Sequence, residues 1–106
     1  MLVNLVDLAG SERVRESGAT ASTLTEACHV NKSLTALGDV ISAIVKGQKH
    51  VPYRNSVLTR VLEPCLDGAS KTLMILAVAD VVSHREHSLQ SLRFGAKVAG
   101  CVVTKP

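Results

Sequence analysis

The chain has 106 residues, of which 46% are hydrophobic, and its formal net charge is +3. This length suits one domain or part of one, and the composition is that of a folding chain rather than a disordered tail. No apolar run approaches the roughly 20 residues that a membrane-spanning helix needs, and no charged leader with an apolar stretch follows Met1, so neither a membrane segment nor a secretion signal is expected.

The first residues predict a buried strand. Residues 2–6 are apolar and partly β-branched, and they end at Asp7, shortly before Gly10. Residues 11–22 are polar and without periodicity, which indicates a loop. Thr23 and Glu26 have the spacing of a capping box, so a helix is expected to begin near Leu24. Its apolar face recurs at helical spacing, and Gly47 is placed to end it near Val45; the residues of that face are Val30, Leu34, Leu37, Ile41 and Ile44.

The second half continues as loop, helix, strand and helix. Residues 46–55 form a basic loop, and Ser56 can cap a short helix that ends before Pro64. Asp67 and Gly68 indicate a turn. Residues 72–78 are a second apolar run and predict a second buried strand. A capping-box pair, Ser83 and Glu86, precedes the last helix, whose inner face is predicted to hold Leu89, Leu92, Ala96 and Ala99.

This order of elements is typical of an α/β fold. Tyr53 and Phe94 are the only aromatic residues, so the core is expected to be aliphatic. Two buried strands are too few for a closed sheet, because each would leave unpaired edges. The sequence therefore resembles a piece of a larger sheet protein. It contains no coiled-coil heptads, so dimerisation is not encoded in this segment.

Cysteines and histidines do not predict a disulfide or a metal site. The three cysteines, Cys28, Cys65 and Cys101, are widely spaced and form no CxxC pair, which is typical of reduced thiols. His84 and His87 have helical i, i+3 spacing, but only Glu86 accompanies them. We therefore expect no zinc site and no direct protein ligand to a metal.

The positive charge is concentrated in residues 40–62. This window holds Lys46, Lys49, Arg54 and Arg60 and no acidic residue, so it carries +4, more than the whole chain's excess. Such a segment favours an acidic partner surface, although a solvated loop with these charges remains an alternative. Nucleic acid is not expected as the partner, because the window has a single aromatic residue, Tyr53, and no stacking platform.

The sequence Asp7-Leu8-Ala9-Gly10 has the DxxG form that nucleotide switches use. An aspartate there can hold a magnesium-bound water, and a glycine amide can approach a terminal phosphate. By itself the pattern fits equally a strand that is capped by Asp and turned by Gly. A GTPase also uses DxxG, but the guanine motif NKxD is not completed here, because Leu34 follows Asn31-Lys32-Ser33.

Five blocks together resemble one family. Residues 7–12 (DLAGSE) are similar to the switch II signature of kinesins, and residues 31–41 (NKSLTALGDVI) to the helix that follows it. The other blocks are HVPYRNS at 50–56 with Leu58-Thr59, KTLM at 71–74, and SLRF at 91–94. They stand in the family order. The resemblance implies that residues 1–106 are the C-terminal part of a kinesin motor domain, a fragment of a three-layer P-loop NTPase with a central sheet flanked by helices.

The resemblance also implies roles for the switch residues. Asp7 would reach Mg²⁺ through water, and the Gly10 N–H would bind the γ-phosphate of ATP. Glu12 would be the catalytic residue, paired with a switch I arginine and organising the attacking water. In the complete motor the cofactors would be ATP and Mg²⁺, which we do not expect residues 1–106 to bind tightly.

A second implied site faces the microtubule, whose surface is acidic. It would include Lys32, Lys49, His50, Arg54 and Arg60, with the long helix coupling switch II to the track. The expected location is the cytoplasm, on the microtubule cytoskeleton, and tubulin is the expected partner.

Several positions depart from the family pattern. No GxxxxGK[ST] phosphate loop and no switch I Ser-Ser-Arg run occur in these residues. Val57 stands where many kinesins carry lysine, Ala79-Asp80 stands in place of Ser-Pro, and Pro64 is expected to end the short helix early. Two interpretations stay open: part of an ATP-driven motor that is divergent or shortened to start at Met1, or a kinesin-like module that binds microtubules or a partner without hydrolysing ATP.

Overall fold

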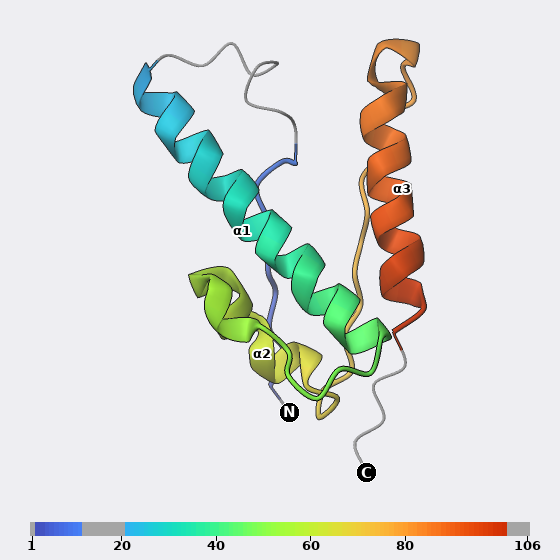
Figure 1. The fold of residues 1–106 in the computed structure, drawn as a ribbon. Helices are drawn as coiled ribbons and strands as arrows, with labels where there is room; N and C mark the ends of the chain where they lie inside the picture. The colour runs from blue at the N-terminus through green and yellow to red at the C-terminus, as the bar shows by residue number, and fades with distance from the viewer. Residues whose placement is uncertain (1, 12–20, 102–106) are drawn as a thin grey trace.

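The computed structural model describes residues 2–11 and 21–101 (Figure 1). Over these residues the chain forms helices and extended segments. The elements are α1 (Ala21–Val45), the short 3-10 helix η2 (Tyr53–Asn55), α2 (Val57–Leu66), the 3-10 helix η3 (Val82–His84) and α3 (Arg85–Ala99). The long helix α1 runs between α2 on one side and α3 on the other, so it forms the centre of the packed part (Figure 1).

The core lies along the C-terminal half of α1. Leu37 and Ile41 are 2% and 1% exposed and pack with Leu62 of α2. Around them lie partly buried side chains of α2 and α3: Leu58, Leu66, Phe94, Val98 and Cys101. The predicted apolar face of α1 is thus confirmed at Leu37 and Ile41, whereas Val30, Leu34 and Ile44 are only half-buried. The buried residues are aliphatic as predicted, and their burial is a main stabilising contribution to folding.

A second row of buried residues on α1 was not predicted. Ala36, Val40 and Ala43 lie beside the first row at the same helical spacing, and Val40 is 0% exposed. Helix α1 is contacted by η2 in addition to α2. The C-terminal half of α1 is therefore covered on more than one side, which explains why alanines there are as well buried as leucines.

The end of α1 follows the sequence prediction. Gly47 has φ 62°, a conformation that side chains disfavour. Its N–H donates to the Ile44 carbonyl at 3.0 Å, and the Gln48 N–H donates to the Ala43 carbonyl at 3.0 Å. These two bonds form a Schellman motif, which satisfies the last carbonyls of the helix. The predicted start was wrong: the helix begins at Ala21, so Thr23 lies inside it rather than capping it.

Helix α2 begins as predicted and ends later. The Ser56 hydroxyl accepts a hydrogen bond from the Thr59 N–H at 3.0 Å, which confirms the predicted cap. Pro64 lies inside the helix, which continues to Leu66. A proline this close to the end removes one N–H from the helix, and the Asp67 N–H still bonds the Glu63 carbonyl at 3.0 Å. Burial of Leu66 against the core offsets the missing bond.

Two predictions for the last helix were wrong. Its N-cap is His84 rather than Ser83, because residues 82–84 form η3 first. The side chains that pack on α1 are Phe94 and Val98, whereas Leu89 and Leu92 are 39% and 53% exposed. Helix α3 carries two apolar rows, and α1 covers only one of them.

Residues 2–6 and 72–78 are extended, but the described part of the chain contains no strand. A strand exists through hydrogen bonds with a neighbouring strand, and these two segments do not pair with each other. Their apolar side chains are exposed rather than buried as predicted: Leu5 is 94% exposed and Ile75 is 87% exposed. The sheet expected from the sequence is therefore not formed within these residues.

The segment 72–79 runs alongside α3 (Figure 1). The Ser88 hydroxyl donates to the Ala79 carbonyl at 2.8 Å and accepts from the Ala79 N–H at 3.1 Å. Leu76 packs directly over Gly95, where an added Cβ would lie 2.2 Å from a Leu76 methyl carbon. None of the described helices has the length and apolar character to cross a membrane.

Candidate functional site

The predicted partner-binding residues lie on the outside of the molecule. Lys32, Lys49, His50, Arg54 and Arg60 are all exposed. The last four belong to one stretch that leads through η2 into α2, whereas Lys32 stands apart in the N-terminal half of α1. Four of the five predicted residues are thus neighbours in the sequence, and their role as one binding surface stays a prediction.

The corner between η2 and α2 is held by a buried threonine that sequence reasoning missed. Thr59 is 0% exposed, and its hydroxyl donates to the Tyr53 carbonyl at 2.6 Å. The same oxygen accepts from the Ser56 N–H at 3.2 Å, completing a reciprocal capping box with Ser56. Buried polar groups are rigid only when they are satisfied in this way. Thr59 thereby fixes Arg54 and Arg60 relative to each other.

The spacing of Ser56 and Thr59 was the only sign of this corner in the sequence. A capping box usually ends in Glu or Gln, so a threonine at its fourth position is a weak indication of this motif. The bond to Tyr53 depends on the turn that η2 makes, which the sequence did not predict.

Acidic groups lie at the other end of α2. Tyr53 has a raised pKa, first because the ring is partly buried and then because Glu63 and Asp67 place negative charge near its hydroxyl. Glu63 also lies one helical turn after Arg60. Glu63 and Asp67 therefore lie close to Tyr53 of η2 as well as after Arg60 in the chain.

The predicted nucleotide-switch residues are only partly described. Asp7 and Gly10 lie in the exposed extended segment 2–11. Glu12 lies outside the described residues. Within residues 2–11 and 21–101 no group of three His, Cys, Asp or Glu side chains is arranged to hold a metal ion. One carboxylate and one glycine amide on an open segment do not enclose a nucleotide, and the expectation that residues 1–106 do not bind ATP and Mg²⁺ tightly stays a prediction.

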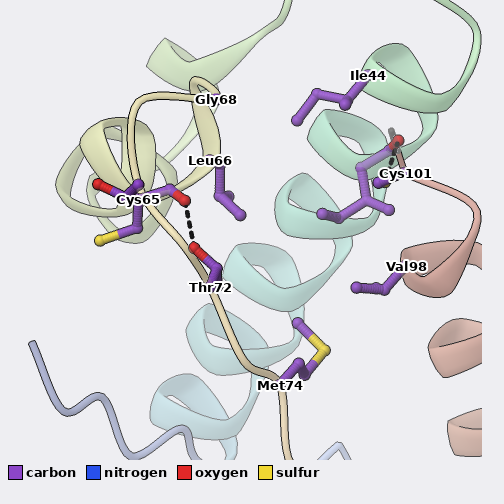
Figure 2. Close-up of a pocket in the computed structure, with 10 residues that line it drawn as sticks. Ile44, Cys65, Leu66, Gly68, Thr72, Met74, Val98 and Cys101 are labelled. Carbon is purple, nitrogen blue, oxygen red and sulfur yellow. Dashed lines mark hydrogen bonds between the residues drawn. The ribbon is translucent and has the colours of Figure 1, made fainter. Parts of the chain in front are cut away.

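A cavity of about 250 Å³ opens where the C-terminal ends of the three helices meet (Figure 2). Ile44, Leu66, Met74 and Val98 line it, together with the thiol of Cys101, whose pKa is raised by burial. The lining residues, all within the described part, include no charged side chain. This cavity is therefore not a candidate site for a phosphate group.

Comparison with known proteins gives the same family as the sequence motifs. A family model for the kinesin motor domain matches residues 2–101. The chain is 51% identical over 105 residues to Kinesin-like protein KIN-14G of Oryza sativa subsp. japonica, covering 99% of this chain and 14% of that protein. It is 50% identical over 100 residues to Kinesin-related protein 2 of Dictyostelium discoideum, covering 94% of this chain and 13% of that protein.

Solved kinesin structures resemble the fold as well. The motor domain of the Kar3-like kinesin from Ashbya gossypii matches with a TM-score of 0.70 and 45% identity, over 88% of this chain and 30% of that one. The dimer of KIF14 with AMP-PNP in complex with a microtubule matches with a TM-score of 0.85 and 40% identity, over 91% of this chain and 27% of that one. The chain spans 14% or less of the two full-length relatives named above, yet nearly all of it is matched. It belongs to the kinesin motor domain family.

Proposed function

We propose that residues 1–106 are the C-terminal part of the motor domain of an ATP-driven, microtubule-based motor. In this role the chain supplies the switch II segment and the microtubule-binding face. The observation that carries the proposal is the fixed η2–α2 corner, which presents Arg54 and Arg60 to solvent within a window that has no acidic residue.

The proposed microtubule face consists of the exposed residues named above: Lys32, Lys49, His50, Arg54 and Arg60. The microtubule surface is acidic, so these charges favour encounter with it. The KIF14 structure that the chain resembles is itself in complex with a microtubule. Because the buried Thr59 fixes the corner, its arginines lose little further freedom when they bind.

We propose that nucleotide binding depends on parts of the motor domain in addition to these residues. Asp7 would contact the Mg²⁺ shell through water, Gly10 would donate its N–H to the γ-phosphate, and Glu12 would organise the attacking water. The bound Mg²⁺ and ATP would supply the reaction's charge neutralisation and its phosphoryl group. We expect residues 1–106 alone to show no ATPase activity, because the two carboxylates repel a triphosphate and a single amide N–H is too little to hold it.

A second candidate function is a microtubule-binding module that does not hydrolyse ATP. It is favoured by one observation: the η2–α2 corner packs on α1 and is held by hydrogen bonds among Tyr53, Ser56 and Thr59, while the bond from residues 2–11 to α2, from Asn4 to the thiol of Cys65, lies near the other end of the helix. Binding could then occur without the switch segment. Microtubule-stimulated ATPase of the gene product that carries this segment distinguishes the two, since the motor requires it and the module does not show it.

Both candidate functions include microtubule binding, and cosedimentation with microtubules at low and at raised salt measures it. The triple variant K49A/R54A/R60A should bind about tenfold more weakly than the parent at low salt, because each exposed contact contributes about 0.2–1 kcal/mol. The difference should shrink as salt screens the charges beyond about 8 Å. A matched control removes one lysine and two arginines elsewhere, K71A/R85A/R93A, all exposed in the parent. Equal pelleting of the two triple variants would overturn the assignment of this surface.

A further inference from the structure

The cavity at the C-terminal ends of the three helices is lined by four separate segments of the chain (Figure 2). Apolar side chains come from each of them: Ile44 from α1, Leu66 from α2, Met74 from the extended segment 72–79 and Val98 from α3. All four are half-buried, and Met74 is the one residue of its segment that is not exposed. Apolar side chains from distant parts of the chain therefore meet around one space.

The polar groups at the edge of the cavity already have partners. The Ser70 hydroxyl donates to the Pro64 carbonyl at 3.0 Å, and the Thr72 hydroxyl donates to the Cys65 carbonyl. Cys65 lines the cavity as well, but its sulfur points away from it (Figure 2). None of the lining residues, all of them described, has a charged side chain. A molecule that fits here is neutral and apolar, because a charged group would lose its hydration without gaining a partner.

The volume of the cavity sets the size of such a molecule. The cavity measures about 250 Å³. An apolar cavity of about 150 Å³ is enough to bind benzene, so this one has room for about two fused aromatic rings. Met74 suits a ligand of this kind, because its flexible thioether side chain adapts to irregular shapes and makes favourable contacts with aromatic rings.

We propose that this cavity is a binding site for a neutral, apolar molecule of that size. The site is separate from the proposed microtubule face, and the proposal does not depend on that function. A ligand there contacts all three helices at once, so it binds the packed state and stabilises it by mass action. Cys101 can report occupancy, because it lines the cavity and its thiol donates to the Ile41 carbonyl of α1 at 3.9 Å.

The test is alkylation of the whole 106-residue chain by N-ethylmaleimide, with naphthalene as the probe ligand and peptide mass spectrometry to follow each cysteine. At a naphthalene concentration ten times the dissociation constant, alkylation of Cys101 should slow about tenfold, because only the unoccupied site reacts. Cys28 is exposed on α1 and should react at an unchanged rate. The anion 2-naphthoate has the same rings and should protect Cys101 much less, since the cavity offers its charge no partner.

Two tryptophan variants locate the site. Met74→Trp places an indole ring in the cavity, so it should slow the alkylation of Cys101 without ligand and remove most of the effect of naphthalene. The matched control Leu73→Trp adds the same ring at the neighbouring position, which is 85% exposed. It should respond to naphthalene like the parent. Far-UV circular dichroism checks that the helices are formed in both variants.

Three results would overturn the proposal. Equal alkylation of Cys101 with and without naphthalene would mean that the cavity takes no ligand of this kind. Equal protection of Cys28, or equal protection by 2-naphthoate, would mean that naphthalene acts at the exposed apolar side chains in general. If Cys101 reacts slowly without ligand and V102D/V103D speeds its alkylation, the chain's own residues after Cys101 fill the cavity instead.

Discussion

The hydroxyl of Thr59 donates a hydrogen bond to the main-chain carbonyl of Tyr53, 2.6 Å away, and no part of Thr59 is exposed to solvent. This bond joins η2 to α2 and so sets the position of two proposed microtubule contacts. Among the described residues Thr59 is the one buried polar side chain, and the other buried residues are aliphatic. Variants of Thr59 that remove the hydroxyl but keep the side-chain volume separate the effect of this hydrogen bond from the effect of packing.

Replacing Thr59 with valine should destabilise the chain by about 1–3 kcal/mol, because the Tyr53 carbonyl and the Ser56 N–H lose their partner while the volume stays the same. Replacing it with serine keeps the hydroxyl and should cost less. Urea unfolding followed by circular dichroism measures both. The control is Thr35→Ala, whose exposed hydroxyl bonds the Asn31 carbonyl within α1. Equal stability of the valine and serine variants would show that the hydroxyl is not what holds the corner.

Substitutions of Gly95 and Leu76 should have strongly non-additive effects on the free energy of unfolding. Alanine at position 95 favours the helix by up to about 1 kcal/mol, but its Cβ would meet a Leu76 methyl carbon at 2.2 Å. We expect Gly95→Ala to be neutral or destabilising in the parent and stabilising in a Leu76→Ala background. A double-mutant cycle by thermal unfolding measures the coupling. Additive effects would mean that Leu76 does not pack over this glycine in solution.

The single tyrosine gives a direct pH test. The pKa of Tyr53 is raised by partial burial and by the charges of Glu63 and Asp67, above its ordinary value near 10. The pKa of Tyr53 is higher in the folded chain than in the unfolded chain. The contribution of Tyr53 to the free energy of unfolding is therefore fully present below about pH 10 and is lost as the pH rises through the folded pKa. Absorbance of the tyrosinate should titrate at a higher pH in the native chain than in urea. Glu63→Gln should lower the native midpoint, and the control Glu86→Gln should not.

The parts of the fold that the sequence predicted are those set by local rules. The α1 face from Leu34 to Ile44 follows from helical periodicity, and the turn at Gly47 from the left-handed conformation that only glycine adopts easily. The Ser56 cap is likewise a contact between residues three apart. Exposure of Arg54 and Arg60 follows from their charge, which water solvates better than a core does.

The following wrong predictions concern features that depend on contacts with residues distant in the chain. The face of α3 that packs is decided by α1, so Phe94 is covered and Leu92 is not, although both rows have helical spacing. The end of α2 passes Pro64 because Leu66 reaches the core. The switch II block predicted Asp7 and Gly10 as nucleotide contacts, and this remains a prediction, since a strand end is positioned only by a sheet that residues 2–11 do not form here.

The last prediction concerns the exposed apolar segments. Leu2 and Leu5 in the first segment, and Leu73 and Ile75 in the second, are 85–94% exposed. Unpaired extended segments with such side chains associate with other chains, through both their apolar faces and their free N–H and C=O groups. We expect residues 1–106 to self-associate with rising concentration and to unfold with low cooperativity. Sedimentation velocity over a concentration series, together with thermal unfolding, measures both properties.

Charged substitutions identify the surface responsible. Leu5→Lys and Ile75→Lys should each lower the association without lowering the helix content, because neither side chain contributes to the core between α1, α2 and α3. The control Val82→Lys adds the same charge at an exposed valine outside both segments, so a loss of association there as well would point to net charge rather than to the segments. A monomer at all concentrations with a sharp thermal transition would contradict the prediction. The aliphatic core around Leu37 and Ile41 would then be sufficient to stabilise the chain, despite the apolar surface that segments 2–6 and 72–78 leave in water.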